Sequence, residues 1–170
     1  DVDTPFLVIR NIDNAPSPSF TDERLKWTKA MLAEARIWSE QRAEWRKRLE
    51  LKTAFPEDIM AWLNQSGAGL SETPTIEGCR DLLSRPMRLV DVVRNEGQPG
   101  GGPFWVLVDE GLDEGRVKPQ IVEAVEFADS TRSLLAEATH FNPVDMVCIL
   151  DPGQSLSPFV DNSRYLRTVK

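Results

Sequence analysis

Four short segments of this chain carry residue types that could bind a ligand or a metal ion. In the first, VIRNIDNA, Asp13 follows an apolar, β-branched run typical of a buried strand. Open α/β sheets bind ligands at the carboxyl ends of their strands, and a carboxylate there can bind Mg²⁺, which prefers oxygen ligands. The same spacing suits an Asx turn made by Asp13 and Asn14. The residues alone leave both interpretations open.

The second segment, residues 97–105, contains three consecutive glycines, Gly100, Gly101 and Gly102. Without Cβ atoms, the backbone N–H groups of such a loop can approach a phosphate or a sugar ring. The segment lacks the Lys and Ser/Thr of a P-loop, and it is not a GxGxxG pattern before a helix. A flexible turn is the plainer alternative, although the aromatic pair Phe104 and Trp105 follows directly.

Two further segments place polar side chains near expected strand ends. Glu123 follows two apolar strand residues and would be costly to bury unpaired. Its carboxylate could accept hydrogen bonds from two sugar hydroxyls, or it could be an ordinary solvent-facing residue. In THFNP, proline keeps Asn142 extended, and the amide could bind a hydroxyl or a phosphate. The single histidine, His140, is expected to be structural rather than catalytic.

Several site classes are excluded by what the sequence lacks. It contains no Ser/His/Asp set, no CxxC pair and no HExxH motif. Its two cysteines, Cys79 and Cys148, fit neither a metal spacing nor a disulfide framework. We therefore expect reduced, buried thiols in a cytoplasmic protein.

The elements that position these segments follow from hydrophobic periodicity. The pattern predicts helices and strands in alternation, which favours an α/β fold. The predicted helices are 22–52, 56–65 and 71–84, and the predicted strands are 6–9, 89–93, 104–109 and 120–127. Residues 128–139 are expected to be helical or irregular, and the apolar run 144–150 fits either a strand or a short helix.

The long helix predicted at 22–52 is the basic element of an acidic protein, with nine basic and six acidic side chains. Thr21 can cap it, and Asp22 and Glu23 suit the positive end of the helix dipole. Its apolar stripe is Trp27, Met31, Ala35, Trp38, Trp45 and Leu49. Such a stripe is typical of a core or a partner interface.

Length and composition bound the remaining possibilities. The 170 residues are 41% hydrophobic and carry a formal net charge of −7, which fits one ordinary domain that repels nucleic acid. No stretch approaches the ~20 apolar residues of a membrane span, and no signal peptide opens the chain. Apolar runs at both ends suggest that the single domain, 1–170, belongs to a longer protein, with a helical insertion at about 20–84.

The four segments, in this order, resemble a bacterial family of unknown function, DUF4301. The resemblance is carried by VIRNIDN, RPMRLVDVVRNEGQPGGGPFWV, QIVEAVEF and THFNPVDMV. It covers roughly residues 4–14 and 85–161, and the helical middle, about 16–80, matches by position only. Members of that family are longer at both ends, which agrees with the apolar runs at the ends of this chain.

That family in turn resembles the nucleotide-diphospho-sugar transferase fold, in particular UDP-sugar pyrophosphorylases. The resemblance implies an incomplete Rossmann-like sheet with flanking helices. Ile12-Asp13-Asn14 is similar to the VDN-like triplet that ends a strand there, which implies that Asp13 supports Mg²⁺. Residues 121–126 resemble a VVEYSE-like strand, and Phe141-Asn142 resembles the start of an FNxGN-like segment. By this resemblance Glu123 and Asn142 hold sugar hydroxyls, and Gly100, Gly101 and Gly102 lie beside the sugar.

The sequence also departs from that pattern. Pro143 stands where the pyrophosphorylases continue with a glycine-type residue. The LxxGxGTRL-like loop that holds nucleotide phosphates does not occur in this sequence, and neither does its activating Lys or Arg.

Three functions remain open at this stage. The first is Mg²⁺-dependent transfer of a nucleotidyl group from a nucleoside triphosphate to a sugar 1-phosphate. The second is a non-catalytic module that binds a nucleotide sugar. The third is an interaction domain that binds its partner through the Trp-rich helix. This hypothesis predicts that Trp27, Trp38 and Trp45 are exposed. No nucleic-acid or membrane partner is expected, and the oligomeric state is open.

Overall fold

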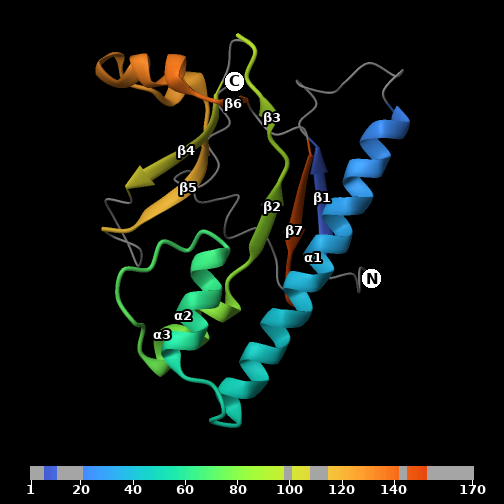
Figure 1. Ribbon diagram of the computed structural model, residues 1–170, viewed down its shortest axis with the longest axis vertical. Coiled ribbons are helices and arrows are strands. Elements are labelled where there is room, and N and C mark those ends of the chain that lie inside the picture. Colours follow the sequence, from blue (N-terminus) through green and yellow to red (C-terminus); the bar gives the residue numbers. More distant parts are fainter. Residues whose placement is uncertain (1–5, 11–20, 98–100, 108–114, 142–144, 153–170) are drawn as a thin grey trace.

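The computed structural model describes residues 6–10, 21–97, 101–107, 115–141 and 145–152. A short strand β1 (Phe6–Arg10) precedes the helices α1 (Thr21–Glu50), α2 (Pro56–Gln65) and α3 (Ile76–Ser84). Strands β2 (Met87–Val90), β3 (Val93–Arg94), β4 (Gly102–Leu107) and β5 (Val117–Val122) follow. Two 3₁₀ segments, η2 (Ala124–Glu126) and η3 (Asp129–Glu137), lead to β6 (His140–Phe141) and β7 (Asp145–Ile149). Figure 1 shows their arrangement.

A three-stranded antiparallel sheet with the order β1-β7-β2 forms the base of the fold. Phe6 and Met87 both lie opposite Ile149, so β7 is the central strand. Val147 and Ile149 are fully buried, and the apolar run at 144–150 is therefore a strand rather than a helix.

The strand predicted at 6–9 is present, but the expectation that it is buried is wrong for most of it. Leu7, Val8 and Ile9 are 42%, 39% and 42% exposed, whereas Phe6 packs into the core. The physical reason is position, because β1 lies at the edge of the sheet and pairs only with β7 among the described strands.

Helix α1 lies diagonally across this sheet and extends beyond it to α2 and α3 (Figure 1). Its first half packs Met31, Leu32 and the fully buried Ala35 against β7. Its second half packs Trp38, Trp45 and Leu49 against a second cluster of apolar side chains. That cluster also contains Ile59, Trp62, Leu63, Cys79 and Leu83.

The predicted stripe of α1 is therefore confirmed as core at every position except Trp27. This side chain is 57% exposed, because α1 extends past the apolar contacts at its N-terminal end. Thr21, predicted as the cap, is the first residue of the helix.

Helix α2 has the predicted boundaries, with Pro56 at its first turn, where the missing N–H is not needed. Gly67 follows it with a φ of +83°, a conformation that favours glycine. Helix α3 begins at Ile76 rather than Ser71, because Pro74 precedes the actual N-cap, Thr75. The Thr75 hydroxyl accepts a hydrogen bond of 3.1 Å from the Gly78 N–H.

Strands β4 and β5 form an antiparallel hairpin, and β3 pairs with β6. Both hairpin strands begin and end two to five residues before the predicted ranges. The largest difference is at the end of β5, because Glu123 starts a 3₁₀ turn there. The second 3₁₀ segment confirms the expectation of a helical or irregular stretch at 128–139.

The expected mixture of helices and strands is confirmed. Every strand pairing among the described residues is antiparallel, whereas a Rossmann-like sheet is mostly parallel. The finer expectation of a Rossmann-like sheet is thus not confirmed. No helix in the described part of the chain is long and apolar enough to cross a membrane.

Candidate functional site

The glycine-rich loop, the end of β5 and the start of β6 meet at one end of the hairpin. A Cβ atom at Gly101 would overlap the Val122 carbonyl oxygen and lie 2.6 Å from the Cα of Glu123. A Cβ atom at Gly102 would lie 2.5 Å from the His140 carbonyl oxygen. Three of the four segments singled out in the sequence therefore converge, and both glycines are needed for the close approach of backbones.

Glu123 lies at this junction, but its carboxylate has a local partner. It forms a capping box with Glu126, in which each side chain accepts a hydrogen bond from the other residue's backbone N–H. The bond from the Glu123 N–H to the Glu126 carboxylate is 2.9 Å long. Glu123 is half-buried, so it is not an ordinary solvent-facing strand residue. Its carboxylate also has a structural role, as the cap of the 3₁₀ turn.

Asn95, two residues before the segment 97–105, joins the loop to the segment that carries His140. Its N–H donates to the Thr139 carbonyl at 3.0 Å, and its amide donates to the Ala138 carbonyl at 3.1 Å. Its Oδ1 accepts the Gly97 N–H at 2.9 Å, which forms an Asx turn. An Asn two residues before a glycine is the signal that could have identified this role.

Asp13, Asn14, Gly100 and Asn142 lie outside the described residues. Their roles as metal or substrate ligands stay predictions.

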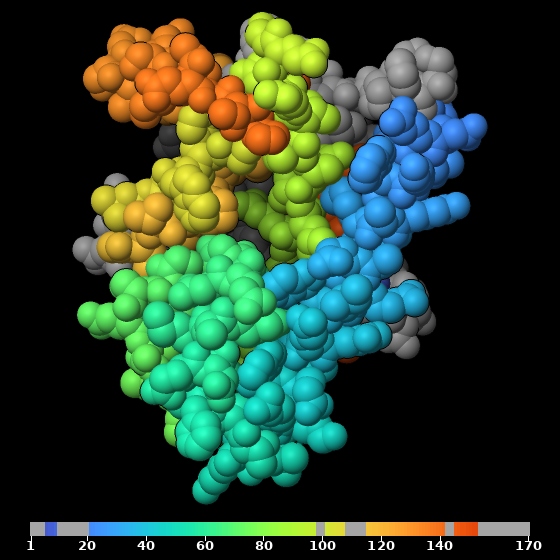
Figure 2. All heavy atoms as spheres, viewed as in Figure 1, coloured from blue at the N-terminus to red at the C-terminus, as the bar shows by residue number. Residues whose placement is uncertain are grey.

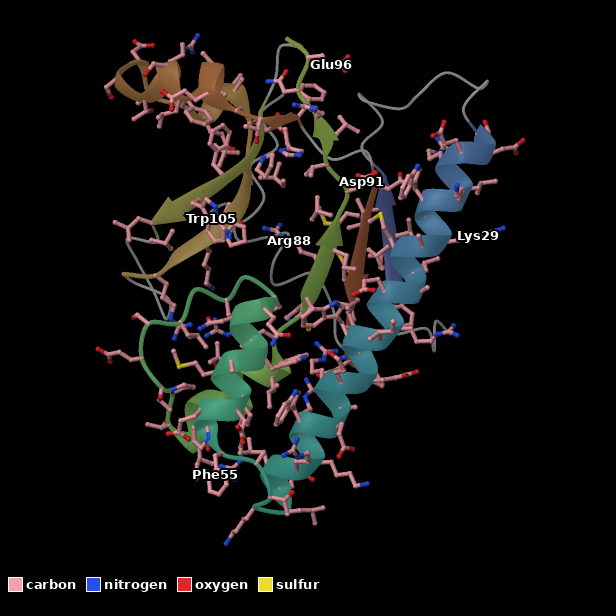
Figure 3. All side chains as sticks on the ribbon, viewed as in Figure 1. Lys29, Phe55, Arg88, Asp91, Glu96 and Trp105 are labelled. Carbon is pink, nitrogen blue, oxygen red and sulfur yellow. The ribbon has the colours of Figure 1, made fainter. Side chains whose placement is uncertain are left out.

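A polar cluster surrounds the end of the sheet where β1 stops. Arg10, the last residue of β1, lies opposite Asp145 in the strand register, and Asp145 is 2% exposed. The Asp145 carboxylate accepts a hydrogen bond of 2.8 Å from the Thr28 hydroxyl, and its N–H donates to the Asp91 carboxylate at 2.8 Å. Figure 3 shows Asp91 at this end of β2. Within the described residues no group of three or more His, Cys, Asp or Glu side chains could hold a metal ion.

A cavity with a volume of about 500 Å³ lies beside the glycine junction. Its walls are β2, the hairpin, the loop after α2, and Trp38 of α1. Pro103 and Ile121, which pair across the hairpin directly next to the pair Gly102 and Val122, line it. Figure 2 shows the surface hollowed between the hairpin and β2. The cavity and the glycine junction therefore share one hairpin.

Among the described residues, Arg88 on β2 and Lys118 on β5 are the cations that line this cavity, and none of the lining residues is a carboxylate. Arg88 projects from β2 toward the hairpin (Figure 3) and donates to the Gln120 side-chain oxygen at 2.5 Å. Trp38 adds an aromatic surface, and the centroid of its ring lies 5.3 Å from the ring centroid of Trp62. Such a lining suits a ligand that has both a ring and a negative charge.

A smaller cavity of about 110 Å³ adjoins the large one. Ser66, Ala68, Met87 and Lys118 are among the residues common to both linings. The charged residues of its described lining are Arg42, Arg85, Arg116 and Lys118, and this part of the lining also contains no carboxylate.

An ion-pair network next to the smaller cavity connects α1 to Asp151, which follows β7. Arg46 binds both carboxylate oxygens of Asp151 at 2.7 Å, and Arg42 binds one at 3.1 Å. Burial opposes ionisation of Asp151, but the hydrogen bond from Arg46 and the charges of Arg42 and Arg46 hold its pKa below the ordinary 3.8. Burial lowers the pKa of Arg42, and Asp151 offsets this only in part.

The sequence reasoning did not identify these cations as site residues. Arg85 and Arg88 lie in the RPMRL string before β2, and Lys118 alternates with apolar residues of β5. Those local patterns fit surface residues equally well. The cavity arises only when the hairpin packs against the loop after α2, where a Cβ atom at Gly67 would lie 2.9 Å from Cγ of Pro119.

Comparison with known proteins gives one match. The model of one protein family, Domain of unknown function (DUF4301), matches residues 1–166. Neither the search of curated proteins nor the search of solved structures found a match.

Proposed function

This chain belongs to the DUF4301 family, and we propose that it binds a sugar phosphate or nucleotide sugar in the cavity of about 500 Å³. The observation that carries the proposal is the charge of the lining. In a protein of net charge −7, the described walls of both cavities contain cations and no carboxylate. A cavity of one sign with apolar walls concentrates ligands of the opposite sign.

Size and composition support a small organic anion. Ligand pockets commonly have volumes of roughly 300–1,000 Å³, with apolar walls and a few polar groups that fix orientation. Here Trp38 and Leu89 supply apolar surface, while Arg88, Lys118 and Gln120 supply polar groups. A sugar or nucleoside ring would lie on the apolar walls, with its phosphate oxygens toward the cations.

The reaction we propose for this chain is nucleotidyl transfer, with a Rossmann-like sheet as part of the same proposal. A phosphate oxygen of the sugar 1-phosphate attacks the α-phosphorus of a nucleoside triphosphate. The bond between the α-phosphorus and the bridging oxygen breaks, and pyrophosphate leaves. Such a reaction depends on positioning and charge stabilisation more than on an acid or base.

In this proposal, residues of the glycine junction contact the sugar. Glu123 and Asn142 hold sugar hydroxyls, and Gly100, Gly101 and Gly102 lie beside the ring. The proposal is supported by the position of Gly102 and Val122, which pair next to the cavity residues Pro103 and Ile121. Free, buried Cys79 and Cys148 are consistent with our proposal of a cytoplasmic, reducing location.

Asp13 is proposed to support Mg²⁺, which would neutralise phosphate charge during transfer. In the described part of the chain, Asp91 and Asp145 are the carboxylates near the end of β1. Neither of them belongs to a group of three or more His, Cys, Asp or Glu side chains that could hold a metal ion, so the described carboxylates do not form a magnesium site by themselves. Asp13 follows Arg10 by three residues, so a chain of that length reaches at most about 10 Å from the strand end.

The first experiment measures binding by tryptophan fluorescence. Glucose 1-phosphate and UDP-glucose are titrated into the protein, with glucose as the uncharged control. Binding in the cavity is expected to change the fluorescence, and Trp38→Phe should remove most of that change. The matched control, Trp27→Phe, alters an exposed tryptophan that does not line the cavity. If no phosphorylated ligand changes the signal, the binding proposal is wrong.

The second experiment separates an enzyme from a binding module. Pyrophosphate release is followed in the protein with Mg²⁺, nucleoside triphosphates and sugar 1-phosphates. An enzyme requires one sugar phosphate and loses its activity in Asp13→Asn and in EDTA. Full activity in Asp13→Asn contradicts the metal assignment.

Binding without turnover is the second candidate function. The capping role of the Glu123 carboxylate favours it, because that group already has a partner within the chain. A fluorescence response with no pyrophosphate release identifies this case.

The interaction-domain hypothesis has less support. It requires exposed tryptophans along α1, whereas Trp38 and Trp45 pack against the core and Trp27 is the exposed member of the three.

A further inference from the structure

We propose that the smaller cavity is the phosphate subsite of this site, an inference that rests on the proposed function. In this arrangement the phosphoryl group of the ligand enters the cavity of about 110 Å³, and the ring stays in the cavity of about 500 Å³. The subsite recognises a phosphoryl group through Arg42, Arg85, Arg116 and Lys118.

The volumes of the two cavities indicate which part of the ligand each of them could hold. At roughly 30 Å³ for each water molecule, the smaller cavity holds the equivalent of about three or four waters. That is room for one phosphoryl group and too little for a nucleoside. The larger cavity, with Trp38 in its wall, has room for a ring.

Charge favours a phosphoryl group over other small polar groups. The smaller cavity has room for little more than one such group, and four cationic side chains line it. They come from α1, from the residues just before β2, from the turn before β5 and from β5 itself. Three of them are arginines, whose planar guanidinium groups bind two oxygens of a phosphate at once. Lys118 lines both cavities and therefore lies where the ring and the phosphate of one ligand would meet.

The position of Arg42 is fixed before any ligand binds. Its side chain is 3% exposed, and it donates to the Arg85 carbonyl at 2.9 Å and to Asp151 at 3.1 Å. Arg42 and Arg46 place two positive charges against the single negative charge of Asp151, so this region favours additional negative charge. A bound phosphate would supply that charge without rearrangement of the guanidinium group.

The test uses calorimetry with inorganic phosphate and with glucose 1-phosphate as probes. Arg116→Gln removes one cation of the subsite, and Lys118→Gln provides a second variant if the first does not fold. Both probes are expected to bind about tenfold more weakly, because a charge-assisted hydrogen bond is lost. The matched control is Arg80→Gln on α3, where the arginine is 55% exposed and pairs with Glu77.

Each outcome has one consequence. Weaker binding in Arg116→Gln or Lys118→Gln, with unchanged binding in Arg80→Gln, supports the subsite. Binding of phosphate alone at the same residues, without glucose 1-phosphate, supports an inorganic-anion site and contradicts the proposed function. Equal glucose 1-phosphate binding in wild type and both subsite variants overturns the subsite and leaves the proposed function standing. A wild-type protein that binds neither probe overturns both.

Discussion

Gly101 has no room for a side chain, because its backbone lies against Val122 and Glu123. We expect Gly101→Ala to lower the free energy of unfolding by about 1–3 kcal/mol, the usual cost of an overpacked position. Thermal unfolding followed by circular dichroism measures this. Gly115→Ala is the control, since nothing lies within 4 Å of its Cβ position and its φ of +79° is the sole strain. A smaller loss in Gly101→Ala than in Gly115→Ala contradicts the steric explanation.

The carboxylate of Asp151 stabilises the fold only while it is ionised. Arg46 and Arg42 lower its pKa below 3.8, so its contribution is present above that pH and is lost as the pH falls through the lower, folded-state value. Asp151→Asn should cost about 1.5–3 kcal/mol at pH 7, the range for hydrogen bonds to charged groups.

Urea unfolding at pH 7 and at a series of pH values from about 5 downward measures this contribution. The difference in stability between wild type and Asp151→Asn should shrink as the pH falls. A constant difference across that range would show that ionisation of Asp151 does not contribute.

Individual residues of the candidate site were predictable from the sequence to different degrees. Gly101, Gly102 and Glu123 were singled out by residue type, and the fold brings them together. Arg42 was not, because its significance depends on Asp151, which is more than a hundred positions away. Local spacing holds no information about such a pair.

At the scale of elements, the N-cap residue of α3, Thr75, acts through one hydrogen bond that a substitution can remove. Thr75→Ala removes the acceptor of the Gly78 N–H and should destabilise the protein by about 1 kcal/mol. Thr75→Ser keeps the hydroxyl and should stay close to wild type. Chemical denaturation of these two variants, with the exposed Thr73→Ala as control, checks the expectation. Equal stability of Thr75→Ala and Thr75→Ser would exclude a capping role.

Helix positions were predicted better than strand positions. The ranges 22–52 and 56–65 agree closely with α1 and α2, because periodic apolar residues and a proline at the first turn are local signals. The predicted start of the third helix, residue 71, is five residues too early, since Thr75 caps a helix that begins at Ile76. The end of β5 depends on the capping box of Glu123, which competes with continued strand pairing.

At the scale of the whole molecule, the packed core protects both thiols. Burial raises the pKa of Cys79, and the nearby Glu57 adds to this. Burial also raises the pKa of Cys148, with partial opposition from Arg88. Because the thiolate is the reactive form, both side chains should react very slowly with a thiol reagent in the native protein.

The measurement is the rate of reaction with Ellman's reagent at pH 8. We expect almost no reaction in the native state and two rapidly reacting thiols in guanidinium chloride. Rapid reaction of one thiol in the native protein would contradict the burial assigned to it.

The order of the strands in the sheet could not be predicted from the sequence. Alternating helices and strands were enough for a mixed α/β fold. They did not show that β7 lies between β1 and β2, or that these pairings are antiparallel. Both facts depend on contacts between residues near position 6 and residues near position 149, which no local pattern encodes.

The central place of β7 has a consequence for synthesis on the ribosome. Both of its neighbours, β1 and β2, are translated before it, so the sheet has no middle strand until residues 145–149 have emerged. At ordinary elongation rates β1 waits on the order of ten seconds for its partner. During that interval the apolar residues Phe6 to Ile9 are open to chaperones, and we expect nascent chains truncated before Asp145 to recruit them more strongly than longer ones.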